Sequence, residues 1–170
     1  SSELRAVELG PADVASAIDE IPVLCLAATQ ARGTTRIRGA GELRNKESDR
    51  IAGIAAGLVA LGAEIAVDGD DLVIPGGQRL RGGTADSIGD HRLAMTFSVA
   101  GLIADDGVTV QRSGSAAVSY PGFFADLEGV QVSTGASRLG NTVKSGQMTP
   151  LKMCWRSAAS VAGSAWTWMG

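Results

Sequence analysis

The sequence is poor in the residues that build metal sites and disulfide frameworks. Its 170 residues contain one histidine, His91, and two cysteines, Cys25 and Cys154. A single histidine cannot form a multi-histidine metal site, and two distant cysteines give neither a disulfide framework nor a metal-type spacing. We therefore expect no metal, and we interpret Cys25 as a small core residue because the residues around it are apolar.

A basic field is absent as well. The formal net charge is -3 and the isoelectric point is about 5.1, which gives no support for binding to nucleic acid or to an anionic membrane. No uncharged apolar run is long enough to cross a bilayer, and no signal peptide is recognisable. We expect a cytoplasmic protein whose partners are neither nucleic acid nor membrane.

The last part of the chain lacks acidic residues altogether. Residues 1–132 hold all 18 acidic and 11 of the 15 basic residues, whereas residues 133–170 hold all three tryptophans and no acid. No helical or strand period runs through residues 133–170. We expect them to form an atypical tail, disordered or foreign; a frameshift, a vector-encoded extension and a natural divergent C-terminus all fit this composition.

The body of the chain, residues 1–132, has the pattern of a repeated α/β unit. Apolar periodicity and turn residues predict helices at residues 21–31, 47–61, 90–104 and 119–127, and strands at residues 34–38, 64–67, 72–74, 108–110 and 130–132. Similar elements return after roughly 70 residues, which indicates a supersecondary repeat. Residues 1–18 are then the end of a preceding unit.

The second predicted helix is unusually apolar. Residues 51–63 carry no charge, so we expect this helix to be enclosed on nearly all sides. Its many alanines and glycines allow close helix packing. The helices should therefore form the inside of the domain, and the strands its outer wall.

Distinctive polar residues precede or open three of the helices: Asp19, residues 46–50 and residues 90–92. Helix N-termini present free N–H groups and favour anions, so the cations placed there indicate an anion that they bind. A solvated first turn, with Glu47 and Asp49 as ordinary N-terminal acids, would explain one such motif. Three motifs in register favour a site for a strongly anionic small molecule.

These motifs resemble one enzyme family. The sequences DEIP at 19–22, KESDR at 46–50, DHRLAM at 90–95 and SYPGFF at 119–124 occur in this order, and the similar stretches cover most of residues 18–127. They resemble EPSP synthase, 3-phosphoshikimate 1-carboxyvinyltransferase, of the shikimate pathway of aromatic amino-acid biosynthesis. The resemblance implies an inside-out α/β barrel of β-α-β-α-β-β units, with helices inside and sheets outside. Residues 1–132 would be a partial C-terminal domain of about two units.

The resemblance also implies roles for individual residues. Asp19 corresponds to the carboxylate that accepts the proton of the attacking hydroxyl of shikimate 3-phosphate. Glu47 corresponds to a second carboxylate that moves a proton to and from the methylene carbon of phosphoenolpyruvate. Such chemistry needs a base and a reversible proton donor, and no metal or organic cofactor.

Substrate-binding roles are implied for five further residues. They are Arg50 and Arg92 for phosphoenolpyruvate, Lys46 for the shikimate hydroxyls, His91 as a neighbouring polar contact, and Glu42 at a substrate-contacting position. Guanidinium groups suit carboxylate and phosphate better than lysine does. Some family members have a further phosphoenolpyruvate-binding lysine where this chain has Val118.

Two other interpretations remain open at this stage. The resemblance implies that the family's N-terminal half, which supplies a catalytic lysine, further arginines and the loop relevant to glyphosate, is missing. The chain could then be an incomplete fragment that binds small anions weakly. Alternatively, it could transfer an enolpyruvyl group to another acceptor, such as a nucleotide sugar. The KESDR and DHR motifs favour the shikimate acceptor, with a complementing N-terminal domain as the expected partner.

Overall fold

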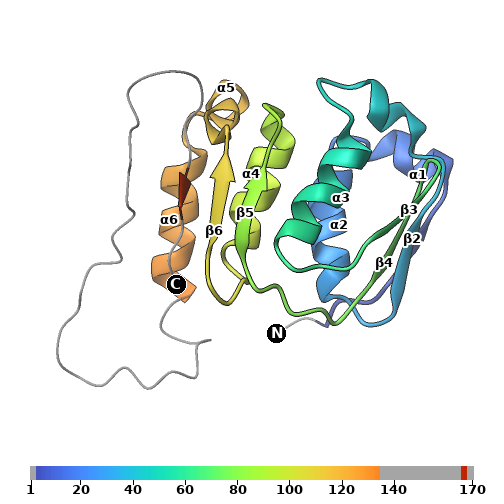
Figure 1. Cartoon of the computed structure of the whole chain (residues 1–170), viewed down its shortest axis with the longest axis horizontal. Helices are drawn as coiled ribbons and strands as arrows, with labels where there is room; N and C mark the ends of the chain where they lie inside the picture. Colours follow the sequence, from blue (N-terminus) through green and yellow to red (C-terminus); the bar gives the residue numbers. More distant parts are fainter. Residues whose placement is uncertain (1–2, 135–165, 168–170) are drawn as a thin grey trace.

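The computed structural model describes residues 3–134 and 166–167, which form two small sheets and several helices (Figure 1). The strands are β1 Glu8–Leu9, β2 Thr34–Ile37, β3 Ala66–Asp68, β4 Asp71–Pro75, β5 Gly83–Asp86, β6 Val108–Gln111 and β7 Trp166–Thr167. The α-helices are α1 Pro11–Ser16, α2 Ile21–Gln30, α3 Arg50–Ala60, α4 His91–Ala100, α5 Ala116–Ser119 and α6 Phe123–Thr134. Two 3-10 helices are η1 Gly41–Asn45 and η2 Ser113–Ser115.

The sheet topology contains a repeat. One sheet has the strand order β1-β2-β4-β3 and the other β5-β6-β7. β1 and β2 are parallel and are connected through α2, and β5 and β6 are parallel and are connected through α4. Adjacent parallel strands need such a crossover. Apart from the short helices, β1-α2-β2-α3 is thus repeated as β5-α4-β6-α6, which supports the predicted repeat.

Helices α2, α3 and α4 lie between the two sheets (Figure 1). This arrangement confirms the expected class, an α/β fold with helices inside and sheets outside. The strands predicted at residues 64–67 and 72–74 correspond to β3 and β4, which pair as an antiparallel hairpin. Its turn joins Asp68 to Asp71, and β4 pairs in turn with β2.

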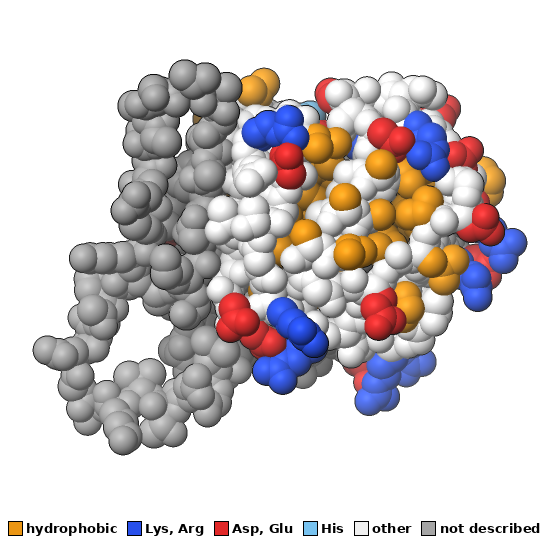
Figure 2. Space-filling model, in the orientation of Figure 1, with side chains coloured by type: hydrophobic (Ala, Val, Ile, Leu, Met, Phe, Trp, Pro, Cys, Tyr) orange, Lys and Arg blue, Asp and Glu red, His pale blue; other side chains and the backbone are white. Residues whose placement is uncertain are grey.

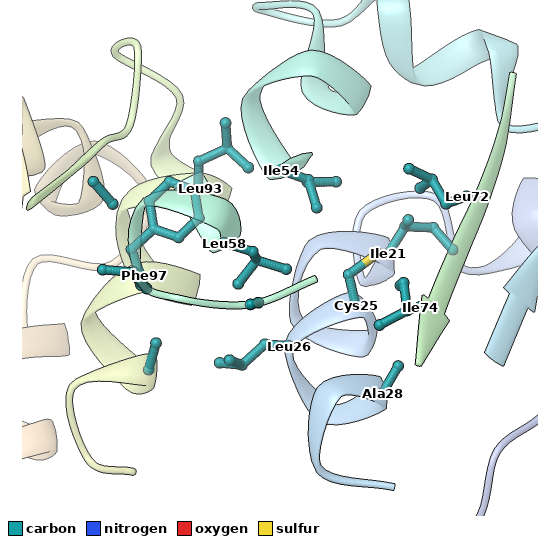
Figure 3. Packing of buried hydrophobic residues seen from close by; sticks show 14 of the residues in the cluster. Ile21, Cys25, Leu26, Ala28, Ile54, Leu58, Leu72, Ile74, Leu93 and Phe97 are labelled. Atoms are coloured by element: carbon teal, nitrogen blue, oxygen red, sulfur yellow. The ribbon is translucent and has the colours of Figure 1, made fainter. Parts of the chain in front are cut away.

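The core joins the inner faces of the helices to the sheets. Figure 3 shows Ile21 and Cys25 of α2 close to Leu72 and Ile74 of β4, with side chains of α3 and α4 on the other side of α2. Cys25 is fully buried and unpaired, as expected for a core residue, and burial raises the pKa of its thiol to about 12. It is therefore a packing residue and not a reactive thiol.

Helix α3 packs closely on α4 through two glycines. A Cβ built on Gly57 would lie 2.0 Å from Cζ of Phe97, and one on Gly53 would lie 2.6 Å from Cδ1 of Leu93.

The opposite face of α3 differs from the expectation that this helix is enclosed on nearly all sides. Val59 is 53% exposed, so within the described residues α3 is not enclosed on nearly all sides. The absence of charge marks a face that is apolar without being covered, and Figure 2 shows such side chains over α3.

Several predicted boundaries are also wrong. The second long helix begins at Arg50, not at residue 47, because the Asp49 side chain accepts from the Ala52 N–H at 3.0 Å and caps the helix there. The helix predicted at residues 119–127 is also displaced, because Ser119 ends α5 and α6 begins at Phe123.

The end of the body also differs from the expectation. The β-branched valines at 130 and 132 suggested a strand, but residues 130–132 belong to α6. Extending an existing helix by a few residues costs little once it has nucleated. Residues 135–165 and 168–170 of the predicted tail lie outside the described residues.

Candidate active site

Three helix starts meet at one end of the molecule, the upper edge in Figure 1. Asp19 lies in the turn before α2, Arg50 is the first residue of α3, and Arg92 is the second residue of α4. Nη1 of Arg50 donates to Oδ1 of Asp19 at 2.8 Å, and Nη2 of Arg92 donates to Oδ2 of Asp19 at 3.1 Å. The structure therefore brings together residues from three sequence motifs that lie 73 positions apart at the extremes.

Arg50 is the centre of this site. Its side chain is only 1% exposed, yet it is charged, and each of its three nitrogens donates to a different carboxylate. Nε lies 2.7 Å from Oδ2 of Asp90, and Nη2 lies 2.6 Å from Oε2 of Glu47. Burial opposes the charged guanidinium, but the hydrogen bonds to Asp90 and Asp19 and the charges of Asp90 and Glu47 together outweigh it and raise the pKa of Arg50.

The three carboxylates around Arg50 differ in exposure. The side chain of Asp90 is completely buried, whereas those of Asp19 and Glu47 are 44% and 55% exposed. Burial opposes ionisation of Asp90, but the Arg50 hydrogen bond and charge and two backbone N–H groups together lower its pKa. The Arg50 hydrogen bond also lowers the pKa of Asp19, against burial and with help from the charges of Arg92 and Lys46. Both aspartates are therefore ionised at neutral pH.

One N–H donor of Arg92 has no hydrogen-bond acceptor among the described residues. Its Nε is buried and makes no hydrogen bond there. Asp19 and Arg92 also line one end of a depression of about 190 Å³, whose other walls include Val23, Met95 and Phe123. A buried donor without an acceptor is costly, so an acceptor from outside the described residues would stabilise this nitrogen.

The remaining predicted residues lie around this centre. Lys46 is exposed and lies near enough to Asp19 for its charge to lower the pKa of that carboxyl. Lys46 precedes α3, as expected, but Glu47 also lies in the loop before α3 and not in the predicted helix. Glu47 nevertheless forms an ion pair with Arg50. His91 is the first residue of α4 and half-buried, and Glu42 is an exposed residue of η1. Neither makes a side-chain hydrogen bond or ion pair within the described part of the chain.

The predicted site residues omitted Asp90 and Ser48. Asp90 caps α4, and its Oδ2 accepts from Nε of Arg50 and, at 3.2 Å, from Oγ of Ser48. The available sequence signal was the aspartate at a helix start, but capping is a local role that does not reveal a partner 40 residues away.

No group of three or more metal-ligating side chains occurs within the part that the structure describes, and no helix there could span a membrane.

The formal charges of the site cancel, since three cations face three carboxylates: Lys46, Arg50 and Arg92 against Asp19, Glu47 and Asp90. An incoming anion therefore has to compete with carboxylates for the guanidinium groups. Asp19 and Glu47 are the exposed partners and can exchange with it, whereas Asp90 is enclosed. The arrangement suits an anion that enters beside two ionisable carboxylates.

Comparison with known proteins agrees with the motifs. The family model of EPSP synthase (3-phosphoshikimate 1-carboxyvinyltransferase) matches residues 2–127. The chain is 53% identical over 127 residues to a protein of that name from Roseiflexus sp. (strain RS-1), covering 75% of this chain and 29% of the relative. It is 51% identical over 132 residues to another from Geobacter sulfurreducens, covering 78% of this chain and 31% of the relative.

Solved structures give the same result. An EPSP synthase from Acinetobacter baumannii superimposes with a TM-score of 0.70 at 37% identity, covering 75% of this chain and 30% of that one. The chain thus spans less than a third of the length of the relatives it matches. On this evidence the chain belongs to the EPSP synthase family.

Proposed function

We propose that this chain forms one wall of the active site of an enzyme that transfers the carboxyvinyl group of phosphoenolpyruvate to shikimate 3-phosphate. The observation that carries the proposal is the meeting of Arg50 and Arg92 at the starts of α3 and α4, with the buried Nε of Arg92 left without an acceptor among the described residues. The names of the relatives support the choice of reaction.

Phosphoenolpyruvate matches the donors of the site. It carries a carboxylate and a phosphate, and both bind well to the paired N–H groups of guanidinium. The helix starts add the positive end of the helix dipole. Arg50 offers its two Nη atoms once Asp19 and Glu47 release them, and Arg92 offers Nε at once.

The two exposed carboxylates are our candidates for the proton transfers. In the transfer, the acceptor hydroxyl oxygen bonds to C2 of phosphoenolpyruvate and loses its proton, while the methylene carbon gains one. Phosphate then leaves C2 with its bond electrons, and the methyl carbon gives up a proton to restore the double bond. We assign the hydroxyl proton to Asp19 and the carbon proton to Glu47.

The ion pairs of Asp19 couple binding to basicity. In the free chain, the hydrogen bond from Arg50 holds the pKa of Asp19 below its usual value. An anion that takes over Arg50 and Arg92 removes these partners, so the pKa of Asp19 rises and its carboxylate becomes a better proton acceptor. The site is then more basic when the substrate is present than when it is absent.

The rest of the shikimate 3-phosphate pocket is assigned to a complementing N-terminal domain, because the chain spans less than a third of its relatives. Phosphate release from the two substrates tests the proposal. The chain should show turnover when mixed with the N-terminal domain of the Geobacter sulfurreducens relative, and Glu47→Gln should abolish it, while Glu64→Gln, on the exposed surface, serves as the matched control. If neither the parent chain nor Glu64→Gln shows turnover above the blank in this mixture, the catalytic role is rejected and a small-anion-binding module remains.

A further inference from the structure

Asp90 is the most fully engaged carboxylate of the site. Its Oδ1 accepts from the backbone N–H groups of Arg92 at 2.8 Å and Leu93 at 3.3 Å. Its Oδ2 accepts from Nε of Arg50 at 2.7 Å and Oγ of Ser48 at 3.2 Å. One buried side chain therefore links the start of α4, the start of α3 and the loop that carries Glu47.

These four hydrogen bonds determine how Arg50 is presented. A guanidinium group is planar, so fixing Nε against Asp90 also fixes the directions of both Nη atoms. Those atoms point to Asp19 and Glu47, which are the exposed partners that an anion can replace. Because the side chains of Asp90 and Arg50 are 0% and 1% exposed, water does not compete for the bond between them.

We propose that Asp90 is a positioning residue, which holds the Nη face of Arg50 toward the incoming anion and the Glu47 loop beside it. The inference rests on the proposed function, since the anion in question is phosphoenolpyruvate. It goes beyond helix capping, because a cap needs only Oδ1, whereas positioning needs Oδ2.

Two substitutions test these roles, and the first of them separates positioning from capping. Serine is a good helix cap, so Asp90→Ser can retain an acceptor for the start of α4 but is too short to hold Nε of Arg50. Asp90→Asn keeps the shape of the side chain but has only one oxygen. That oxygen can accept from the backbone N–H groups at the start of α4 or from Arg50 and Ser48, but not from both sets. Asp86→Asn is the matched control, because Asp86 also binds an arginine Nε at 2.8 Å and a backbone N–H, but at the surface.

The test uses the full chain labelled with ¹⁵N, and phosphoenolpyruvate as the probe. One readout is the dissociation constant, and the other is the solvent-exchange rate of the Arg50 Nε–H signal, assigned from its absence in Arg50→Lys. Asp90→Ser should weaken binding by about 10- to 100-fold and speed up the exchange by a similar factor, as expected for losing a hydrogen bond between charged groups. Asp86→Asn should leave both readouts unchanged.

Unchanged binding and unchanged Nε–H exchange in a folded Asp90→Ser variant would overturn the inference. If the parent chain does not bind phosphoenolpyruvate, the proposed function is rejected, and the exchange rate alone still decides whether Asp90 holds Arg50. If Asp90→Ser does not fold, Ser48→Ala decides, because its hydroxyl donates to Oδ2 of Asp90. The expected loss of affinity is then about two- to tenfold, and no loss overturns the inference.

Discussion

The starts of α3 and α4 each have an aspartate cap that binds an arginine, but the two pairs differ in their exposure to solvent. Asp49 caps α3 with Oδ1 and binds Nη1 of Arg44 with Oδ2 at 2.9 Å. Asp90 caps α4 with Oδ1 and binds Nε of Arg50 with Oδ2 at 2.7 Å. The side chains of Asp49 and Arg44 are 41% and 36% exposed, whereas those of Asp90 and Arg50 are 0% and 1% exposed.

This difference changes what each pair does. Water screens the Asp49–Arg44 pair, so it acts as a local brace between α3 and the β3–β4 turn, where Arg44 also binds Asp70. The Asp90–Arg50 pair has no water to replace a missing partner, so removing either residue leaves a buried charge. The buried pair is therefore the one on which the geometry of the site depends.

The largest effect is expected when the buried cation is removed. Arg50→Met leaves Asp90 buried without its guanidinium partner and should lower the free energy of unfolding by about 3–5 kcal/mol. Urea denaturation followed by circular dichroism measures this change. Arg44→Met is the matched control at the exposed pair and should have a much smaller effect. Equal losses in the two variants would show that burial does not distinguish the pairs.

A smaller effect is expected from acid. The pKa values of Asp19 and Asp90 are lowered in the folded chain, so below the usual pKa of about 3.9 the unfolded chain binds more protons. The stability that these groups contribute is complete above that pH and is lost as the pH falls through their folded pKa values. Urea midpoints between pH 2 and pH 6 should therefore fall with acid, and less steeply in Asp90→Asn. The same slope in both proteins would contradict the role of Asp90.

The smallest effect is expected at the exposed cap. Asp49→Ala removes the acceptor for the Ala52 N–H and should cost about 1 kcal/mol of stability, typical of a lost helix cap. Asp49→Ser should recover most of it. Phosphoenolpyruvate binding should be retained in both variants, because the side chain of Asp49 is bound by Arg44 and Ala52 and not by the guanidinium group of Arg50. A loss comparable to that in Arg50→Met would mean that the exposed start is as critical as the buried one.

Local patterns in the sequence predicted much of this architecture. Apolar periodicity located α2 and α4 and the β3–β4 hairpin, because these elements are stabilised by contacts that short stretches encode. It failed at residues 130–132, where the strand preference of valine competes with the extension of α6. It also missed β5, because the Gly83–Asp86 sequence has little strand propensity and its pairing strand β6 lies far along the chain.

The candidate site was predicted unevenly for a related reason. Asp19, Glu47, Arg50 and Arg92 were identified by motifs, and the structure brings their side chains into contact. Asp90 was recognised only as a residue at a helix start, because its pairing with Arg50 depends on how α3 packs on α4. The exposure of Val59 was missed because the absence of charge in a helix does not show whether one of its faces or all of them are covered.

The central claim is that Arg50 and Arg92 form an anion site at the meeting helix starts. The most direct measurement is a titration of the ¹⁵N-labelled chain with phosphoenolpyruvate, followed through its backbone amides. Saturable shifts should centre on residues 47–50 and 90–93, and Arg92→Ala should weaken binding by about 10- to 100-fold, whereas Arg112→Ala, at a surface pair, should not. Unchanged binding in Arg92→Ala, or shifts spread over the surface arginines, would contradict the account.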